Sequence, residues 1–208
     1  MELDELAQMG VRVQVVQADV AQLGELAAVL AQIDERTPLK GVIHCAGVLD
    51  DGALLQQSWE RFAKVLTPKA QGAWNLHHLT QDMALDFFVL FSSASSVLGN
   101  RGQANYAAAN ACLDALAQHR HARGLPALSI NWGAWAEGGM AAGLARSRRA
   151  RMAAQGVRMI TPAEGTAALA RLPGQSAPQV GVFALDWAKL QAREPALAEL
   201  LLAAALAS

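Results

Sequence analysis

Apolar residues occur in two kinds of segment that alternate along the chain: short continuous runs and longer stretches with helical periodicity. The short runs predict strands at residues 11–17, 40–45, 85–91, 127–132 and 179–185. The longer stretches predict helices at residues 23–34, 58–80 and 103–123, a basic helix after 143, a helix from 162 and an apolar C-terminal helix. This alternation is typical of an α/β fold with a doubly wound parallel sheet in three layers, whose sites lie at the carboxyl ends of the strands.

Local signals set the ends of these helices. Ser58 is placed to cap the second helix, and Pro68 should kink it or split it in two. Gly124 should end the third helix. Residues 161–164 form a capping box with Pro162 at the first helical position.

Composition limits the classes of function. The 208 residues include 17 Lys and Arg against 18 Asp and Glu, for a net charge of −1, and 53% are hydrophobic. Such a chain is too apolar for a disordered segment and has no excess of positive charge for binding nucleic acid. Three of the first five residues are acidic, unlike a signal peptide, and the apolar run at 196–207 contains Glu199 and is too short for a bilayer. We therefore expect a cytoplasmic protein with no nucleic-acid or membrane partner.

Candidate metal and disulfide residues are few. Cys45 and Cys112 are too few for a disulfide scaffold or a zinc cluster, and both are expected to be buried, reduced thiols. The pairs His77–His78 and His119/His121 come without further ligands, so we expect exposed or core histidines and no metal site.

The most informative polar residues follow the run at 85–91. Ser93 lies where this strand leaves the sheet, and Tyr106, the only tyrosine, begins the next helix four positions before Asn110. Residues four apart project from one face of a helix. Taken alone, these residues fit either a core aromatic beside loop serines or a catalytic group.

Four segments, in this order and spacing, resemble the short-chain dehydrogenase/reductase superfamily and, within it, the ketoreductase domains of modular polyketide synthases. The segments are residues 42–51, 91–93, 102–110 and 129–133. The resemblance implies a Rossmann-like fold, with residues 1–190 as the catalytic part and 191–208 as a C-terminal helix or the start of a linker.

The resemblance also implies a catalytic set of Ser93, Tyr106, Lys69 and Asn110. Most of the superfamily carries Tyr-x-x-x-Lys, but here Asn110 takes the fourth position after Tyr106. In polyketide ketoreductases the lysine and the asparagine are exchanged, and Lys69 matches the lysine position. Ser93 is chosen among the loop serines because it precedes Tyr106 by 13 positions, as in the family. We expect Lys69 to lower the pKa of Tyr106 towards the working pH.

The cofactor implied by the resemblance is NADPH. Asp19 and Val20 match the position at a strand end where the family's aspartate bonds the adenine, although Asp19 could instead cap the next helix. His44, Ala46 and Gly47 match the small-residue turn that lets the cofactor approach the backbone closely.

The substrate side rests on similar matches. Leu49-Asp50-Asp51 resembles the fingerprint of B-type ketoreductases, which implies a D-configured (3R) hydroxyl product. Leu98 stands where A-type enzymes carry a tryptophan, and Gln103 belongs to the tyrosine motif. The segment from Trp132 to Met140 resembles a flexible lid over the substrate and its phosphopantetheine arm.

The implied partners are an acyl carrier protein bearing the β-ketoacyl chain and other domains of the synthase. A basic turn could contact an acidic carrier protein or a phosphate, or could equally be a solvated helix face. Its residues are Arg146, Arg148, Arg149 and Arg151.

The chain contains no Gly-x-Gly-x-x-Gly, so the first βαβ unit of the fold, which takes the cofactor's pyrophosphate, is expected to be absent. Residues 1–10 resemble the tail of the helix before the family's third strand. Two hypotheses follow. The chain is the catalytic part of a reductase of β-ketoacyl thioesters, or it is a non-catalytic fragment or interaction module that cannot bind NADPH alone.

Overall fold

A parallel sheet of four strands forms the centre of the computed structural model, which describes residues 5–6, 8–137 and 146–206. The strand order is β1-β2-β3-β5, with bounds Gly41–His44, Phe87–Ser93, Leu128–Trp132 and Gln179–Val182. The register pairs Val42 with Phe88, Val89 with Leu128 and Ile130 with Val180. The predicted α/β fold with a parallel sheet is confirmed.

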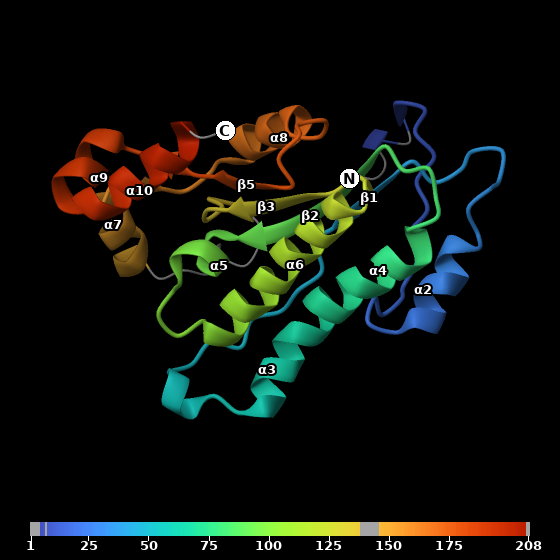
Figure 1. Cartoon of the computed structure of the whole chain (residues 1–208), viewed down its shortest axis with the longest axis horizontal. Coiled ribbons are helices and arrows are strands. Elements are labelled where there is room, and N and C mark those ends of the chain that lie inside the picture. Colours follow the sequence, from blue (N-terminus) through green and yellow to red (C-terminus); the bar gives the residue numbers. More distant parts are fainter. Residues whose placement is uncertain (1–4, 7, 138–145, 207–208) are drawn as a thin grey trace.

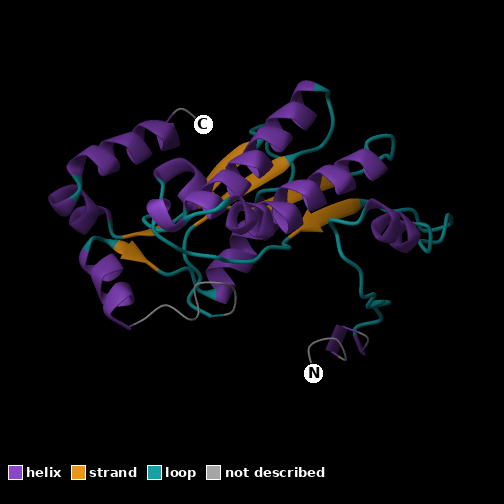
Figure 2. Cartoon of the chain, turned by 90° about the horizontal axis from the view of Figure 1, so that it is seen from below, coloured by secondary structure: helices purple, strands orange, loops and turns teal. Residues whose placement is uncertain are grey.

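Helices cover both faces of the sheet (Figures 1 and 2). Phe88 and Leu90 of β2 point to one face, where they pack against α4 (Gly72–Thr80), α6 (Ala104–Ala122) and, beyond α4, α2 (Leu23–Leu30). Val89 points to the opposite face and joins the core under α8 (Pro162–Arg171). Phe88, Val89 and Leu90 point to alternate faces and are all buried, which is why this part of the strand is continuously apolar, as its sequence predicts.

The expected kink at Pro68 is a widened turn within one continuous helical segment. Helix α3 (Trp59–Leu66) begins at Ser58, whose Oγ accepts a hydrogen bond from the Arg61 amide. A π-helical segment, Thr67–Gln71, then joins α3 to α4. A proline cannot donate the usual helical hydrogen bond and crowds the preceding turn, and the wider π turn accommodates both effects.

The remaining elements complete the chain. Their bounds are η1 Leu54–Gln56, α5 Ala94–Leu98, α7 Arg146–Ala154, β4 Val157–Arg158, β6 Ala184–Leu185, α9 Trp187–Arg193 and α10 Pro195–Leu206. Gly124 ends α6 with a φ of 70°, and the capping box of Thr161 and Glu164 is present. Among the described residues, the helices are too short or too polar to cross a membrane.

Two predicted strands differ from the structure. Residues 11–17 form no strand and are exposed, with Val15 at 76%. A strand needs hydrogen bonds from a neighbour, and β1 pairs only with β2 in the described part of the chain. The predicted strand at 179–185 is divided at Phe183, because β6 leaves the main sheet to pair antiparallel with β4.

The two cysteines are exposed, so the expectation of buried thiols is wrong. Cys45 has already left β1 for the loop that follows it. Cys112 lies on α6, whose buried face runs through Ala109, Leu113 and Leu116. An apolar neighbourhood in sequence does not place a residue on the buried face of its helix.

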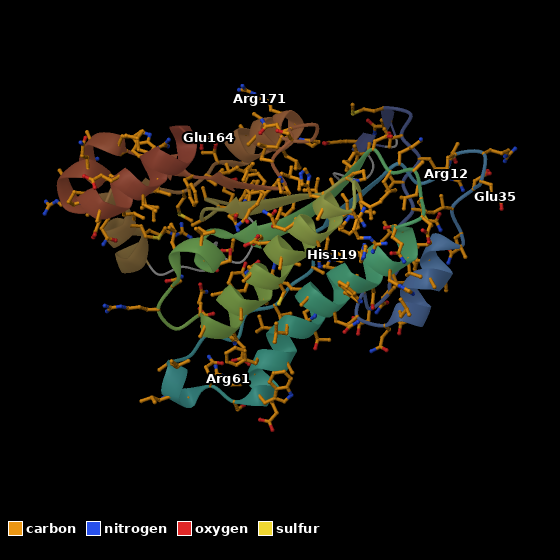
Figure 3. All side chains as sticks on the ribbon, in the orientation of Figure 1. Arg12, Glu35, Arg61, His119, Glu164 and Arg171 are labelled. Atoms are coloured by element: carbon orange, nitrogen blue, oxygen red, sulfur yellow. The ribbon has the colours of Figure 1, made fainter. Side chains whose placement is uncertain are left out.

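A cluster of histidines joins α4 to α6. His77 is buried, and its Nδ1 lies 3.0 Å from Nη1 of the buried Arg120, whose guanidinium lies 3.8 Å from the centroid of the Phe88 ring. His119, labelled in Figure 3, packs its ring 5.5 Å from that of His77. Burial lowers the pKa of His77 to about 4, so its ring is neutral at neutral pH. These contacts make it a core histidine, and the described residues contain no group of three or more potential metal ligands.

A buried carboxylate ties α6 to the sheet. Asp114 accepts hydrogen bonds from Ser129 Oγ at 2.5 Å, Ser96 Oγ at 2.6 Å and Asn131 Nδ2 at 3.0 Å. Asn131 also donates to Ser92 Oγ at 3.1 Å. The network therefore fixes α5, α6, β2 and β3 relative to one another directly beneath the end of β2.

We expect Asp114→Ala to lower the free energy of unfolding by about 3 kcal/mol, because it leaves buried donors without an acceptor. Urea titration followed by tryptophan fluorescence measures this. Asp82→Ala, at an exposed aspartate, is the matched control and should change stability by less than about 0.5 kcal/mol. Equal effects of the two substitutions would contradict a stabilising role for the network.

Candidate active site

The structure brings the four expected catalytic residues together at the carboxyl ends of β1 and β2. Ser93 is the last residue of β2 and caps α5, with its Oγ 3.2 Å from the Ser95 amide. Tyr106 and Asn110 lie on α6, and Lys69 lies on the π-helical segment. The Lys69 Nζ lies 5.5 Å from the centroid of the Tyr106 ring.

Lys69 is a buried cation held by the backbone. Its side chain is 2% exposed, and Nζ donates to the Phe91 carbonyl at 2.9 Å, two residues before Ser93. Burial lowers the pKa of Lys69 to about 8, against the smaller opposing effects of Cys45 and Asp114. The ammonium is therefore close to releasing its proton at mildly alkaline pH.

The pKa of Tyr106 moves opposite to the expected direction. Burial raises it, the neighbouring Asn110 and Ser93 side chains act to lower it, and the Asp51 charge raises it further. The Lys69 Nζ is itself directed at the Phe91 carbonyl. The Tyr106 hydroxyl is thus fully protonated at neutral pH and able to act as a proton donor.

Asn110 is fully buried beside Tyr106. Its Nδ2 donates to the Tyr106 carbonyl at 2.8 Å, one turn earlier in α6. Its Oδ1 is buried with no hydrogen-bond partner among the described residues. An acceptor in this position can take a hydrogen bond from a molecule that enters the site.

The three residues expected to contact the cofactor at the end of β1 lie in two environments, one buried and one in the loop. The His44 ring is buried with Nε2 3.1 Å from the Lys69 carbonyl, and burial lowers its pKa to about 4. Its side chain therefore fixes the π-helical segment, and a contact of His44 with the cofactor stays a prediction. Ala46 and Gly47 are partly exposed in the loop beyond β1, where a contact with the cofactor stays a prediction.

Asp19 and Val20 lie just before α2. Asp19 is exposed, and its Oδ1 accepts a hydrogen bond from the Ala21 amide at 2.9 Å, while Gln22 is the N-cap of α2. Val20 packs against α4, where its carbonyl accepts from Asn75 Nδ2 at 3.0 Å. The adenine contact at Asp19 also stays a prediction.

The predicted substrate residues lie in different environments. Asp51 accepts two hydrogen bonds from Gln103 Nε2, at 3.0 and 3.1 Å, so these two are in contact. Leu49, at the start of the same motif as Asp51, is partly buried. Leu98 on α5 is 37% exposed. Met140 lies outside the described residues.

Trp132 is not part of a lid. It is the last residue of β3, pairs with Ser93 and Val182, and is 4% exposed. Its ring packs 5.3 Å from Phe91 and 5.0 Å from Trp135. The residue belongs to the core because Trp132, where the lid was expected to start, is still part of β3.

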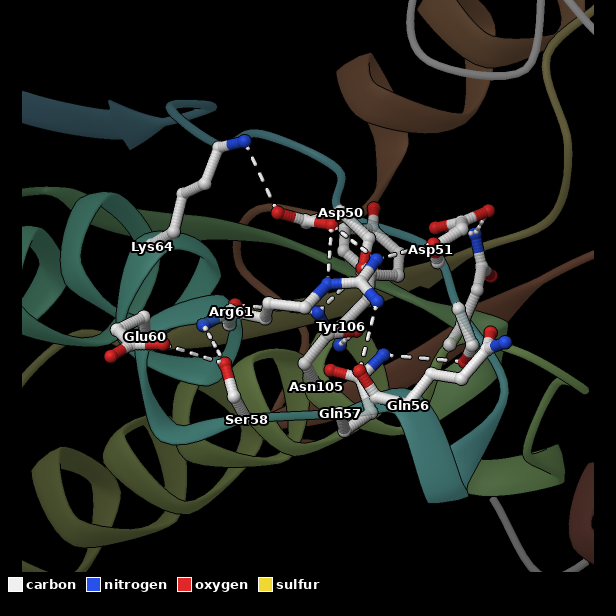
Figure 4. Close-up of polar contacts among 12 residues, drawn as sticks. Asp50, Asp51, Gln56, Gln57, Ser58, Glu60, Arg61, Lys64, Asn105 and Tyr106 are labelled. Carbon is white, nitrogen blue, oxygen red and sulfur yellow. Dashed lines mark hydrogen bonds and ion pairs between the residues drawn. The ribbon is translucent and has the colours of Figure 1, made fainter.

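Sequence reasoning missed Arg61 and Asn105. Figure 4 shows both beside Tyr106 and the Asp50–Asp51 loop. Asn105 directly precedes Tyr106 and is fully buried, which is unusual for an asparagine within a helix. Its place directly before Tyr106 was the signal that the sequence offered for Asn105. Arg61 resembled any other charged residue of an exposed helix, so the sequence offered no signal for it.

The parallel α/β sheet and the Ser–Tyr–Lys–Asn set at its carboxyl end define a protein of the short-chain dehydrogenase/reductase class. The family model described as "KR domain" matches residues 1–137, two thirds of the chain. The chain therefore belongs to the ketoreductase-domain family of modular polyketide synthases.

Curated relatives are much longer than this chain. Polyketide synthase GfsB of Streptomyces halstedii is 49% identical over 190 residues, 91% of this chain and 3% of that protein. Mycoketide-CoA synthase of Mycobacterium tuberculosis is 48% identical over 161 residues, 77% of this chain and 4% of that protein. The chain thus spans a small part of the relatives it matches.

Solved structures agree in fold. One described as "Structure of A-type Ketoreductases from Modular Polyketide Synthase" has a TM-score of 0.84 and 40% identity, covering 92% of this chain and 40% of that one. "The first ketoreductase of the tylosin PKS" has a TM-score of 0.79 and 41% identity, with 92% and 42% covered. A C2-type ketoreductase reaches 0.81, so overall similarity does not distinguish the stereochemical types.

The lowered pKa of Lys69 predicts a distinct pH dependence of stability. Between pH 8 and the ordinary lysine pKa of 10.5, the unfolded chain binds more protons than the folded one, so stability rises with pH. We expect this group to add about 2 kcal/mol between pH 7 and pH 9.5. Urea titrations at the two pH values measure the change.

Lys69→Met should remove that rise, whereas Lys64→Met, at a lysine whose side chain is 60% exposed, should retain it. Other titrating groups are common to all three proteins and cancel in the comparison. The same pH dependence in wild type and Lys69→Met would contradict a buried, proton-releasing Lys69.

Proposed function

We propose that the chain is the catalytic part of a ketoreductase domain that reduces a carrier-bound β-ketoacyl thioester to the β-hydroxyacyl thioester, with NADPH as reductant. The observation that carries this proposal is the convergence of Lys69, Ser93, Tyr106 and Asn110 at one end of the sheet. A ketone becomes an alcohol by gaining a hydride and a proton, and no side chain supplies a hydride.

The proton comes from Tyr106. Its raised pKa keeps the hydroxyl protonated until negative charge develops on the substrate oxygen. Ser93 Oγ, at the end of β2, donates a hydrogen bond to the same oxygen and stabilises that charge. Lys69, with its Nζ 5.5 Å from the ring centroid, is a cation close to the phenolate that remains, and the Asn110 amide fixes the first turn after Tyr106. The proton of Tyr106 is then restored from solvent.

The residues of this chain fit the nicotinamide half of the cofactor, which supplies the hydride when bound. Lys69 offers a buried ammonium, Asn110 Oδ1 a buried acceptor without a partner among the described residues, and Gly47 a backbone without a side chain. Asp19 and Val20 are proposed on the adenine side. Because the sequence has no Gly-x-Gly-x-x-Gly turn, the pyrophosphate of the cofactor must be held by other residues.

The product is proposed to carry the D-(3R) hydroxyl. This assignment rests on the Leu49-Asp50-Asp51 motif and on Leu98 in place of the tryptophan of A-type enzymes. The contact between Asp51 and Gln103 supports it, since it places the motif's carboxylate beside the start of the tyrosine helix.

The proposed partners are an acyl carrier protein with its phosphopantetheine-tethered chain and the other domains of a cytoplasmic synthase. The basic turn belongs to helix α7, which lies near α9 in Figure 1. A net charge of −1 suits a tethered thioester better than a polyanionic substrate.

In a synthase module that carries this chain, Tyr106→Phe should lower kcat for a β-ketoacyl thioester by roughly 10²- to 10⁴-fold, because the proton donor is lost. Ser93→Ala should lower kcat by a similar factor, and Ser176→Ala, at an exposed loop serine, is its matched control. NADPH oxidation at 340 nm measures the rates. Retention of near-full rate by Tyr106→Phe would exclude Tyr106 from the mechanism.

We expect the 208-residue chain by itself to bind NADPH weakly, since it has no glycine-rich pyrophosphate turn. Isothermal titration calorimetry of the isolated chain is the measurement, and the synthase module is the positive control. A micromolar dissociation constant for the isolated chain would overturn this expectation. Tight binding by the module alone would distinguish the reductase from a non-catalytic interaction module.

A further inference from the structure

One arginine holds the loop that carries the Leu-Asp-Asp motif (Figure 4). Arg61 Nε donates to Asp50 Oδ1 at 2.8 Å, and Nη2 donates to the same oxygen and to the Asp51 carbonyl at 2.6 Å. Nη2 also lies 3.3 Å from the Asp50 carbonyl, and Nη1 donates to the Gln56 carbonyl at 3.1 Å. The guanidinium thus bonds both aspartates of the motif and the turn that follows them.

The same loop is bonded to the start of the tyrosine helix. Asn105 Nδ2 donates to the Asp50 carbonyl at 2.8 Å, and Asn105 Oδ1 accepts from the Tyr106 amide at 2.8 Å. The Gly52 amide donates to the Gly102 carbonyl at 2.8 Å. Loop and helix are therefore joined both by the backbone and through Asn105.

Gly52 leaves the space that Arg61 occupies. A Cβ at this position would lie 2.5 Å from Arg61 Nη1 and 2.8 Å from Nη2. The guanidinium packs directly on the backbone of the loop, so the loop and Arg61 constrain each other. Such close packing is possible only where the loop residue has no side chain.

The two aspartates of the motif have different roles. The Asp50 carboxylate pairs with Arg61 and, at 3.1 Å, with Lys64, and hydrogen bonds from both cations lower its pKa. Asp51 instead accepts from Gln103, and no ion pair joins it to a cation among the described residues. The bonds of Arg61 and Asn105 to the loop form a support to which the Asp50 carboxylate belongs. Asp51 is the carboxylate that this support holds beside Tyr106.

We propose that Arg61 is a positioning residue that fixes the Asp50–Gly52 loop against the start of α6 and thereby sets the direction from which the substrate approaches Tyr106. This role rests on the proposed reductase function. Arg61 acts only through Asp51 and the Asn105–Tyr106 link. Charge-assisted bonds to the two loop carbonyls, of Asp50 and Asp51, and to the Asp50 carboxylate give the loop a single orientation.

The test is Arg61→Met in a synthase module that carries this chain, because methionine retains much of the apolar stem. A loosened loop admits the substrate in both orientations, so the ratio of the two β-hydroxy diastereomers should fall by roughly 10-fold and KM should rise. The pH profile of kcat should be unchanged, since Tyr106 still donates the proton. Chiral chromatography of the released product gives the ratio.

Two variants serve as comparisons. Arg61→Lys keeps a cation for Asp50 but loses the planar fork that reaches the two carbonyls, so its product ratio should lie between those of wild type and Arg61→Met. Lys64→Ala removes only the exposed ion pair to Asp50 and should leave the ratio unchanged. If Arg61→Met fails to fold, Arg61→Lys provides the decisive ratio.

Hydrogen–deuterium exchange in the isolated chain tests the support independently of catalysis. Arg61→Met should speed exchange of the Gly52 amide at least 10-fold, whereas Lys64→Ala should not. Unchanged exchange overturns the support itself, and faster exchange with an unchanged product ratio overturns its role in substrate approach. A wild-type module without reductase activity overturns the proposed function and this role together, and the exchange data still show whether the support exists.

Discussion

Burial of the Lys69 ammonium is the constraint around which the site is built. The cation must lie at the end of the sheet with little water, so its neighbours have to hold it without a direct carboxylate partner. The Phe91 carbonyl accepts from Nζ, and His44 fixes the carbonyl of Lys69 itself at 3.1 Å. The lysine lies within the π-helical segment Thr67–Gln71, directly after Pro68.

Close approach of α4 makes the same arrangement possible. A Cβ at Gly72, the first residue of α4, would lie 2.7 Å from Val20 and 3.3 Å from His44. Glycine therefore lets the helix pack near both residues directly after the π-helical segment. Two polar networks then complete the frame: Asp114 fixes the Ser93 side from within the core, and Arg61 fixes the Asp51 side near the surface.

Elements defined by local pattern were predictable, and those defined by distant partners were not. The periodicity of α6 and the apolar run of β2 specify their structure, and the signals at Ser58, Gly124 and Thr161 are confirmed. Residues 11–17 have the composition of a strand, but a strand also needs a neighbour that no local pattern supplies. The convergence of the four catalytic candidates was predictable only through resemblance to a family, because they are spread over 42 positions.

The pKa of Tyr106 shows why a motif alone does not define chemistry. Proximity of Lys69 in the motif suggested a lowered value, but burial dominates and the ammonium is bonded elsewhere. A tyrosine with a raised pKa is a weak acid, and it gives up its proton readily only once an alkoxide develops beside it. The site therefore depends on where the substrate oxygen is held, relative to Ser93 on one side and the loop of Asp51 on the other. Rigid support of that loop is for this reason part of the chemistry as well as of the fold.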